Sequence, residues 1–237
     1  LRRASFRHQL FPDAHLVHLI PPMKKSSVPF VVAATVLGLF AFTACSSNTY
    51  DRAGSASQSL QSSADLIATT RAQLSRVGAS LQLLKRDGDL ARYYNIFVEQ
   101  VDALEKSAAA VAASATKMTA NQASYVKQWT RDLEKIQNTG LRQASQARLD
   151  EINAGFANIR TRYEETRAAF VPFLTDLKDI RTALGADLTP VGAERIRPYI
   201  DDALNTIEPV KSAVEKLAAD FASFGVALQP ATSPETP

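Results

Sequence analysis

The chain has 237 residues, of which 46% are hydrophobic and only nine are glycine, so it is long enough to bury a core and its composition favours long helices. From Cys45 onward it carries 22 Lys and Arg residues against 23 Asp and Glu residues, a formal net charge of −1 that argues against a nucleic-acid partner. Its three histidines all precede Met23 and Cys45 is its single cysteine, which excludes a Ser-His-Asp triad, a Cys-His pair, a typical zinc site and an internal disulfide from the region after Cys45.

The start of the chain has the pattern of an export signal. Residues 1–22 fit neither a signal peptide nor a helical region, and we interpret them as an over-extended gene model with translation starting at Met23; a longer n-region is the alternative. Residues 23–44 predict a signal peptide, because Lys24 and Lys25 precede an apolar run. That run of about 15 residues falls short of the roughly 20 that span a bilayer, which favours cleavage over an uncleaved anchor.

The signal ends in a motif that resembles the bacterial lipobox. Thr43 and Ala44 are the small residues that precede a cysteine destined to carry acyl chains such as palmitate, although Phe42 departs from the usual Leu, Val or Ile. Several acyl chains on Cys45 would anchor the protein stably. We therefore expect a lipoprotein tethered through Cys45, at the periplasmic face of the outer membrane in a Gram-negative host because Ser46 follows; a secreted protein with a free thiol is the alternative.

After Cys45 the composition predicts three regions. Residues 45–59 are rich in Ser, Asn, Gly and Gln, which predicts a flexible tether. Residues 229–237 hold three prolines and no periodicity, which predicts a disordered tail. Residues 60–228 repeat apolar side chains at spacings of three and four, which predicts a helical bundle.

Turn and cap signals divide the bundle into four helices. The first stretch ends before Asp87, Gly88 and Asp89, which offer a turn and an acidic cap for the next helix. The second stretch alternates apolar steps of four and three as a heptad seam up to Trp129. A turn is predicted at 138–140, where this helix ends.

Prolines mark the third and fourth stretches. The third repeats the heptad seam and should bend at Pro172 rather than end there. Thr189 followed by Pro190 is a helix-start signature for the fourth stretch, which Pro198 and Pro209 should bend or divide. Short connections make neighbouring helices antiparallel, so we predict an all-α fold: an elongated antiparallel helical bundle in which helices two and three form a coiled-coil-like hairpin flanked by helices one and four.

Several short features resemble a known family. They are a Gly88-Asp89-Leu90 turn followed by Tyr93, Trp129 with Leu133 before a turn, Leu141-Arg142 with Ser145, and Tyr163. On these residues most of the region after Cys45 resembles domain-of-unknown-function family 2959, a family of uncharacterised bacterial envelope proteins. The resemblance implies a helical lipoprotein and supplies no activity.

Polar and aromatic residues within the seams have structural and functional interpretations. Tyr125 and Trp129 occupy seam positions, where core packing is the expectation and a recognition patch the alternative. Gln122 and Arg71 interrupt apolar seams, and such residues more often fix helix register than bind a ligand. The alanine-rich run 107–115 favours close packing within the chain, with a contact between copies in a homo-oligomer as the alternative.

No group of residues nominates a catalytic, cofactor or metal site. The carboxylate groupings predict solvated helix faces, because adjacent acids point about 100° apart on a helix and no histidine accompanies them. These groupings are Glu164-Glu165, Asp201-Asp202, and Asp176 with Asp179. An enzyme that uses carboxylates alone is therefore the weakest hypothesis.

The leading functional hypothesis is a non-enzymatic cell-envelope lipoprotein. A membrane anchor joined to a helical rod without a reactive site is expected to offer its side or its end to a periplasmic or envelope protein partner. The alternative is a periplasmic chaperone or stress sensor that binds apolar clients when the proline-bent helices separate.

Overall fold

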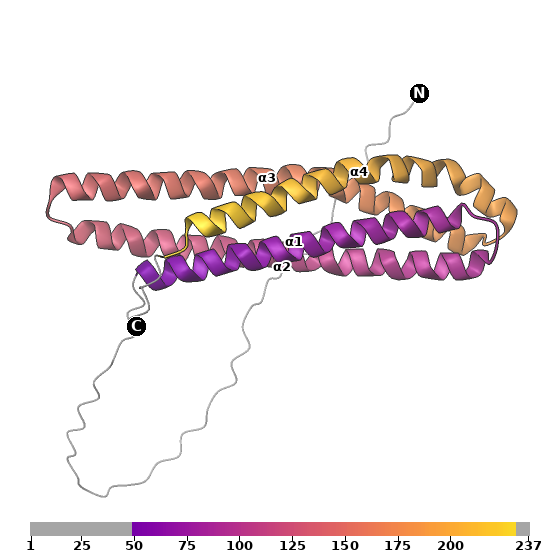
Figure 1. Ribbon diagram of the computed structural model, residues 1–237, viewed down its shortest axis with the longest axis horizontal. Coiled ribbons are helices and arrows are strands. Elements are labelled where there is room, and N and C mark those ends of the chain that lie inside the picture. The colour runs from indigo at the N-terminus through magenta and orange to yellow at the C-terminus, as the bar shows by residue number, and fades with distance from the viewer. Residues whose placement is uncertain (1–48, 231–237) are drawn as a thin grey trace, which may run out of the picture. The chain divides into compact units, whose positions relative to one another are not determined.

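The computed structural model describes residues 49–230 as four α-helices, with successive helices antiparallel (Figure 1). They are α1 (Thr49–Leu84), α2 (Leu90–Lys135), α3 (Thr139–Ala186) and α4 (Pro190–Ala227). The predicted all-α helical bundle is confirmed. The predicted gene-model extension, signal peptide and lipidated Cys45 lie outside the described residues, as does the tail from 231 onward.

Short polar side chains start three of the helices. Asp89 accepts a hydrogen bond from Arg92 N at the start of α2, and Thr189 accepts one from Gly192 N at the start of α4, both at 3.0 Å, so both predicted starts are confirmed. Gly88 provides the turn before α2 with a positive φ of 137°. Asn138 accepts a hydrogen bond from Leu141 N at 3.0 Å and begins α3. The turn predicted at 138–140 is therefore only partly correct, because Thr139 and Gly140 already belong to the first turn of α3.

The helix α1 begins earlier than the sequence suggested. It starts at Thr49, so the prediction of a flexible tether is wrong for residues 49–59. Ala56 and Ser57 are each only 2% exposed, and Ser57 Oγ donates to Gly225 O of α4 at 2.7 Å. Serine and glycine serve here as small residues that let two helices approach closely, and composition alone does not separate that use from a solvated linker.

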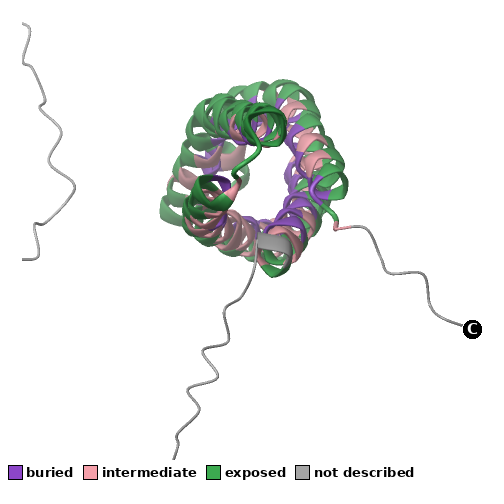
Figure 2. Ribbon diagram, turned by 90° about the vertical axis from the view of Figure 1, so that its left-hand side faces the viewer, coloured by how far each residue is buried: buried purple, intermediate pink, exposed green. Residues whose placement is uncertain are grey.

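The four helices surround a common core, with their buried faces turned inward (Figure 2). The most extensive packing joins α1 to α2 and to α4, α3 packs on α4, and α2 and α3 are the neighbours with the sparsest packing. The hairpin predicted as the centre of the bundle is therefore its loosest side. One reason is that hydrogen bonds hold α2 close to α1 rather than to α3. Ser63 of α1 bonds Ser114 of α2 at 2.7 Å, and Thr70 of α1 bonds Ser107 of α2 at 2.6 Å.

The prolines inside α3 and α4 interrupt neither helix. Both helices continue through Pro172, Pro198 and Pro209, so α4 is not divided. Phe170 and Phe173 stay buried on either side of Pro172, which keeps the seam intact. Among residues 49–230, no helix combines the length and the apolarity that a membrane-spanning segment needs.

Candidate functional site

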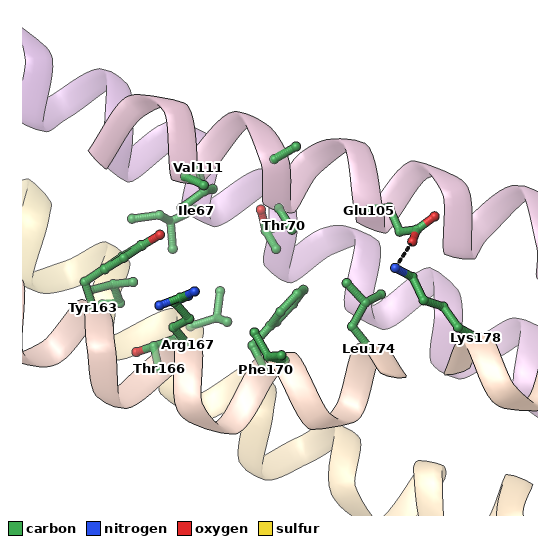
Figure 3. Close-up of a pocket in the computed structure, with 16 residues that line it drawn as sticks. Ile67, Thr70, Glu105, Val111, Tyr163, Thr166, Arg167, Phe170, Leu174 and Lys178 are labelled. Atoms are coloured by element: carbon green, nitrogen blue, oxygen red, sulfur yellow. Dashed lines mark ion pairs between the residues drawn. The ribbon is translucent and has the colours of Figure 1, made fainter. Parts of the chain in front are cut away.

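A groove opens between α2 and α3, in the stretch where the two helices separate. At one end of this stretch Lys178 of α3 pairs with Glu105 of α2, and at the other Arg160 donates to Gln122 Oε1 at 3.3 Å. Between these two bridges lies a cavity of about 350 Å³, lined by residues of all four helices (Figure 3). We call it the α2–α3 groove.

The alanine-rich run explains why the groove is open. Between Glu105 and the far end of the groove, α2 lines it with Val111 and with three alanines, whose methyl groups are too short to reach α3; these are Ala108, Ala109 and Ala112. On its other side the same run is drawn to α1 by the hydrogen bond between Ser107 and Thr70 at 2.6 Å. The run therefore packs within the chain on one side only, and the space facing α3 stays unfilled.

The floor of the groove is apolar and its mouth carries a cation. Ile67 of α1, Phe170 of α3 and Leu217 of α4 are buried beneath it. At the mouth Val171 is 49% exposed, and Arg167 extends from α3 toward the cavity (Figure 3). Arg167 also pairs with Glu164 of its own helix at 3.4 Å, a long and exposed contact that contributes little.

Tyr163 closes one end of the groove. Its side chain is half-buried, and this burial raises the pKa of its hydroxyl above the ordinary value of 10.0, with the Arg167 charge acting in the opposite direction. The hydroxyl is therefore neutral at physiological pH and available to donate a hydrogen bond. Apolar, hydroxyl and guanidinium groups arranged in this way can hold a molecule, but they do not form the nucleophile and base pair of a reactive site.

The aromatic pair predicted from the α2 seam belongs to the core. Tyr125 is 3% exposed, and its ring centroid lies 5.5 Å from that of the half-buried Trp129. Burial raises the pKa of the Tyr125 hydroxyl. The interpretation as core packing is confirmed, and neither residue lines the α2–α3 groove.

The prediction that Arg71 lies in the apolar seam of the first helix is wrong. Its neighbour Thr70 takes the buried seam position at 4% exposure, while the Arg71 side chain points outward and pairs with Glu215 of α4 at 3.3 Å. Either residue satisfies a spacing of three or four. The shorter Thr70 occupies the buried position because its hydroxyl hydrogen-bonds Leu66 O and Ser107. Gln122 does bridge two helices, as its hydrogen bond from Arg160 shows.

The carboxylate groupings lie mostly on exposed surfaces beside basic residues. Glu164 and Glu165 pair with Arg167 and Arg162, and Asp201 pairs with Lys85. A separate hollow between α3 and α4 is lined by three other carboxylates, Asp176, Asp179 and Asp202. Within residues 49–230 no group of three or more His, Cys, Asp or Glu side chains is placed to hold a metal ion.

The groove itself was not anticipated from the sequence. The signal for it is the placement of alanines on one face of α2 opposite Phe170 of the α3 seam. From the sequence, the alanine run predicts close packing within the chain. Only the three-dimensional arrangement shows that α2 leans toward α1 and away from α3.

The fold and the groove together define an all-α helical bundle with a cavity suited to binding. The chain belongs to the DUF2959 family of proteins of unknown function, whose match spans residues 49–220 and so covers α1, α2, α3 and most of α4. No curated protein and no solved structure matches the chain.

Proposed function

We propose that this protein is a non-enzymatic, lipid-anchored envelope protein that binds a protein partner through the α2–α3 groove. The groove is the observation that carries the proposal. It is lined by apolar side chains from four helices, several of them buried at its floor, and Val171 at its mouth is 49% exposed although it is apolar. An exposed apolar surface within a charged exterior is typical of an interaction site.

The chemistry of the groove favours an amphipathic helix as the partner segment. Such a segment would place apolar side chains at positions i, i+3 or i+4, and i+7 over Phe170 and Leu174, between the walls formed by α2 and α3. An acidic residue beside them would pair with Arg167, whose ion pair with Glu164 is long and exposed. The alanine wall of α2 would allow the close approach of a helix backbone.

The groove can be tested by crosslinking in cells. A photo-reactive amino acid at Ala109, on the α2 wall, should yield a reproducible crosslink to an envelope protein. The same amino acid at Ala72, exposed on α1 and outside the groove, is the matched control. Crosslinks of equal yield at both positions, or none at Ala109, would count against the groove as a partner site.

The anchor is tested separately. The lipobox motif supports acylation of Cys45, and the periplasmic face of the outer membrane is the proposed location. The intact mass of protein extracted from envelopes should equal that of a chain beginning at Cys45 plus acyl groups, and the Cys45→Ala variant should lose this mass. An unmodified or uncleaved chain would remove the anchor from the proposal.

The second candidate is the chaperone or stress sensor that binds apolar clients. The same exposed groove favours it, because an open apolar surface also suits unfolded segments. Purified protein that suppresses the aggregation of several unrelated unfolded clients would support this candidate. Dependence on a single crosslinked partner would support the first.

A further inference from the structure

The connection between α2 and α3 projects beyond the rest of the bundle. Figure 1 shows this turn lying past the start of α1 and the end of α4. Two contacts mark where the projection begins: Arg52 near the start of α1 donates to Ser124 of α2, and Arg148 of α3 donates to Ala227 O, the last residue of α4. Because α1 and α2 are antiparallel, Thr49 lies about level with Lys127. We call residues 127–148 the hairpin tip.

The hairpin tip is basic, whereas the remainder of the region after Cys45 is acidic. It holds five bases and two acids, a formal net charge of +3; the bases are Lys127, Arg131, Lys135, Arg142 and Arg148, and the acids are Asp132 and Glu134. The remaining 17 bases and 21 acids give a net charge of −4. The opposite end of the bundle, residues 81–95 and 183–197, carries five bases and four acids, so its net charge is only +1.

Two neighbouring residues at the extreme of the tip do not serve the stability of the fold. Leu141 is 64% exposed although it is apolar. Arg142 lies in the first turn of α3, where the helix dipole disfavours a cation and where no acidic residue is present. An exposed apolar side chain and a cation in these places suit an external partner that is anionic and that also has an apolar region into which Leu141 can insert.

The point at which the proposed anchor joins the fold indicates which partner this is. Cys45 precedes Thr49 by four residues, a length of chain that spans at most about 14 Å. From the level of Thr49, α2 continues for about 12 Å to its last residue before the chain turns back. The proposed anchor is therefore attached to the chain at the end of the bundle where the hairpin tip projects, and the turn extends about as far from Thr49 as four residues can reach.

We infer that the hairpin tip contacts the anionic phospholipid surface to which Cys45 is anchored, so that the protein stands on the membrane by two points. This inference rests on the proposed lipid anchor. Arg131 and Arg142 supply attraction to lipid phosphates, and Leu141 enters the headgroup layer. Standing in this way holds the α2–α3 groove away from the membrane and open to a periplasmic partner.

The test uses the sole cysteine as a tether and the sole tryptophan as a probe. The chain from Cys45 to Pro237, a compact unit of its own that contains all four helices, is coupled through the Cys45 thiol to a maleimide lipid in vesicles. Energy transfer from Trp129, inside the tip, to a dansyl-labelled headgroup reports how close the tip lies to the surface. The vesicles contain phosphatidylcholine alone or phosphatidylcholine mixed with phosphatidylglycerol.

We expect transfer to be at least about twofold greater on the anionic vesicles at low salt, and to fall to the neutral level in high salt. The Arg131→Glu/Arg142→Glu variant should lose the difference between the two vesicles. The control variant Arg86→Glu/Arg195→Glu, which changes the same number of exposed charges at the opposite end, should keep it. Circular dichroism checks that both variants remain helical, and the salt arm needs no variant.

Equal transfer on neutral and anionic vesicles, or an equal loss in the control variant, would overturn the inference. Failure of Cys45 acylation in cells is a different result, detected by the intact mass. Because the maleimide lipid supplies the tether in the vesicle experiment, that failure would remove the proposed anchor without altering what the tip itself does at a membrane.

Discussion

Trp129 donates its indole N–H to Ser145 Oγ at 2.9 Å, across the two helices of the hairpin tip. Beyond the ends of α1 and α4 the tip is held by contacts between α2 and α3, so this bond should matter. Ser145→Ala leaves the half-buried indole N–H without this acceptor, and we expect the free energy of unfolding to fall by about 1 kcal/mol. Urea unfolding followed by circular dichroism measures the change.

The matched control is Ser75→Ala on α1. Ser75 is exposed and donates to Arg71 O within its own helix at 3.4 Å, so its loss should change the free energy of unfolding by less than about 0.5 kcal/mol. If both variants unfold at the same urea concentration as the parent protein, the bond across the tip does not contribute to stability.

Gly155 of α3 lies directly beneath the ring of Phe224 of α4. A Cβ atom at position 155 would overlap this ring, which itself packs edge-on against Phe156 with ring centroids 4.9 Å apart. Gly155→Ala should therefore destabilise the protein by about 1–3 kcal/mol, against the usual gain from replacing a helical glycine. Thermal or urea unfolding of the variant measures the sign.

Two further variants isolate the cause. In a Phe224→Ala background the overlap is gone, so Gly155→Ala should become neutral or stabilising. Gly54→Ala on α1 meets only Pro230 at 3.8 Å, an ordinary contact, and should stabilise by about 0.5–1 kcal/mol. A destabilisation that persists in the Phe224→Ala background would contradict the overlap as its cause.

Local signals in the sequence were sufficient for the helices but not for their pairing. Asp89 and Thr189 start helices because an acceptor side chain followed by a helix-forming stretch has few other uses. Which helix lies nearest to which depends on small residues whose meaning is not local. Ser57 lies in the segment whose composition predicts a flexible tether, and Ser107 begins the alanine-rich run, yet both hold helices together through hydrogen bonds to residues distant in the sequence.

The candidate site shows the same limit. The seam of the third helix predicts that Thr166 and Phe170 face inward, and both are buried beside the groove. Whether an opposing helix fills the space in front of them depends on the tilt of α2, which is set by its bonds to α1 on the other side. A heptad pattern contains no information about that tilt, so the groove and the position of Arg167 at its mouth follow only from the structure.

Filling the groove should separate its role in binding from any role in stability. Ala108 lines the groove and is half-buried against the core. Ala108→Leu adds apolar volume to empty space, so we expect the free energy of unfolding to stay unchanged or to rise by about 0.5–2 kcal/mol. The same variant should abolish the crosslink formed from position 109.

Ala113→Leu, on the exposed face of α2 away from the groove, is the control for this substitution and should leave the crosslink intact. A crosslink that survives Ala108→Leu, in a variant with unchanged helical content, would mean that the partner contacts the surface beside the groove rather than its interior.

The burial of Tyr125 and Tyr163 predicts how stability depends on alkaline pH. Burial raises the pKa of both hydroxyls above their ordinary value of 10.0. Each tyrosine therefore ionises more readily in the unfolded chain than in the folded one. Its contribution to stability is complete below about pH 10, the unfolded pKa, and is lost as the pH rises through the folded pKa.

We expect the free energy of unfolding to decline above about pH 10, and Tyr163→Phe to reduce the steepness of that decline because phenylalanine has no proton to lose. Urea unfolding at a series of pH values measures the slopes. If the slope is the same in Tyr163→Phe as in the parent protein, the Tyr163 hydroxyl at the end of the groove reaches water freely. The groove would then be more hydrated at that end than its lining of Ile67, Phe170 and Leu217 implies.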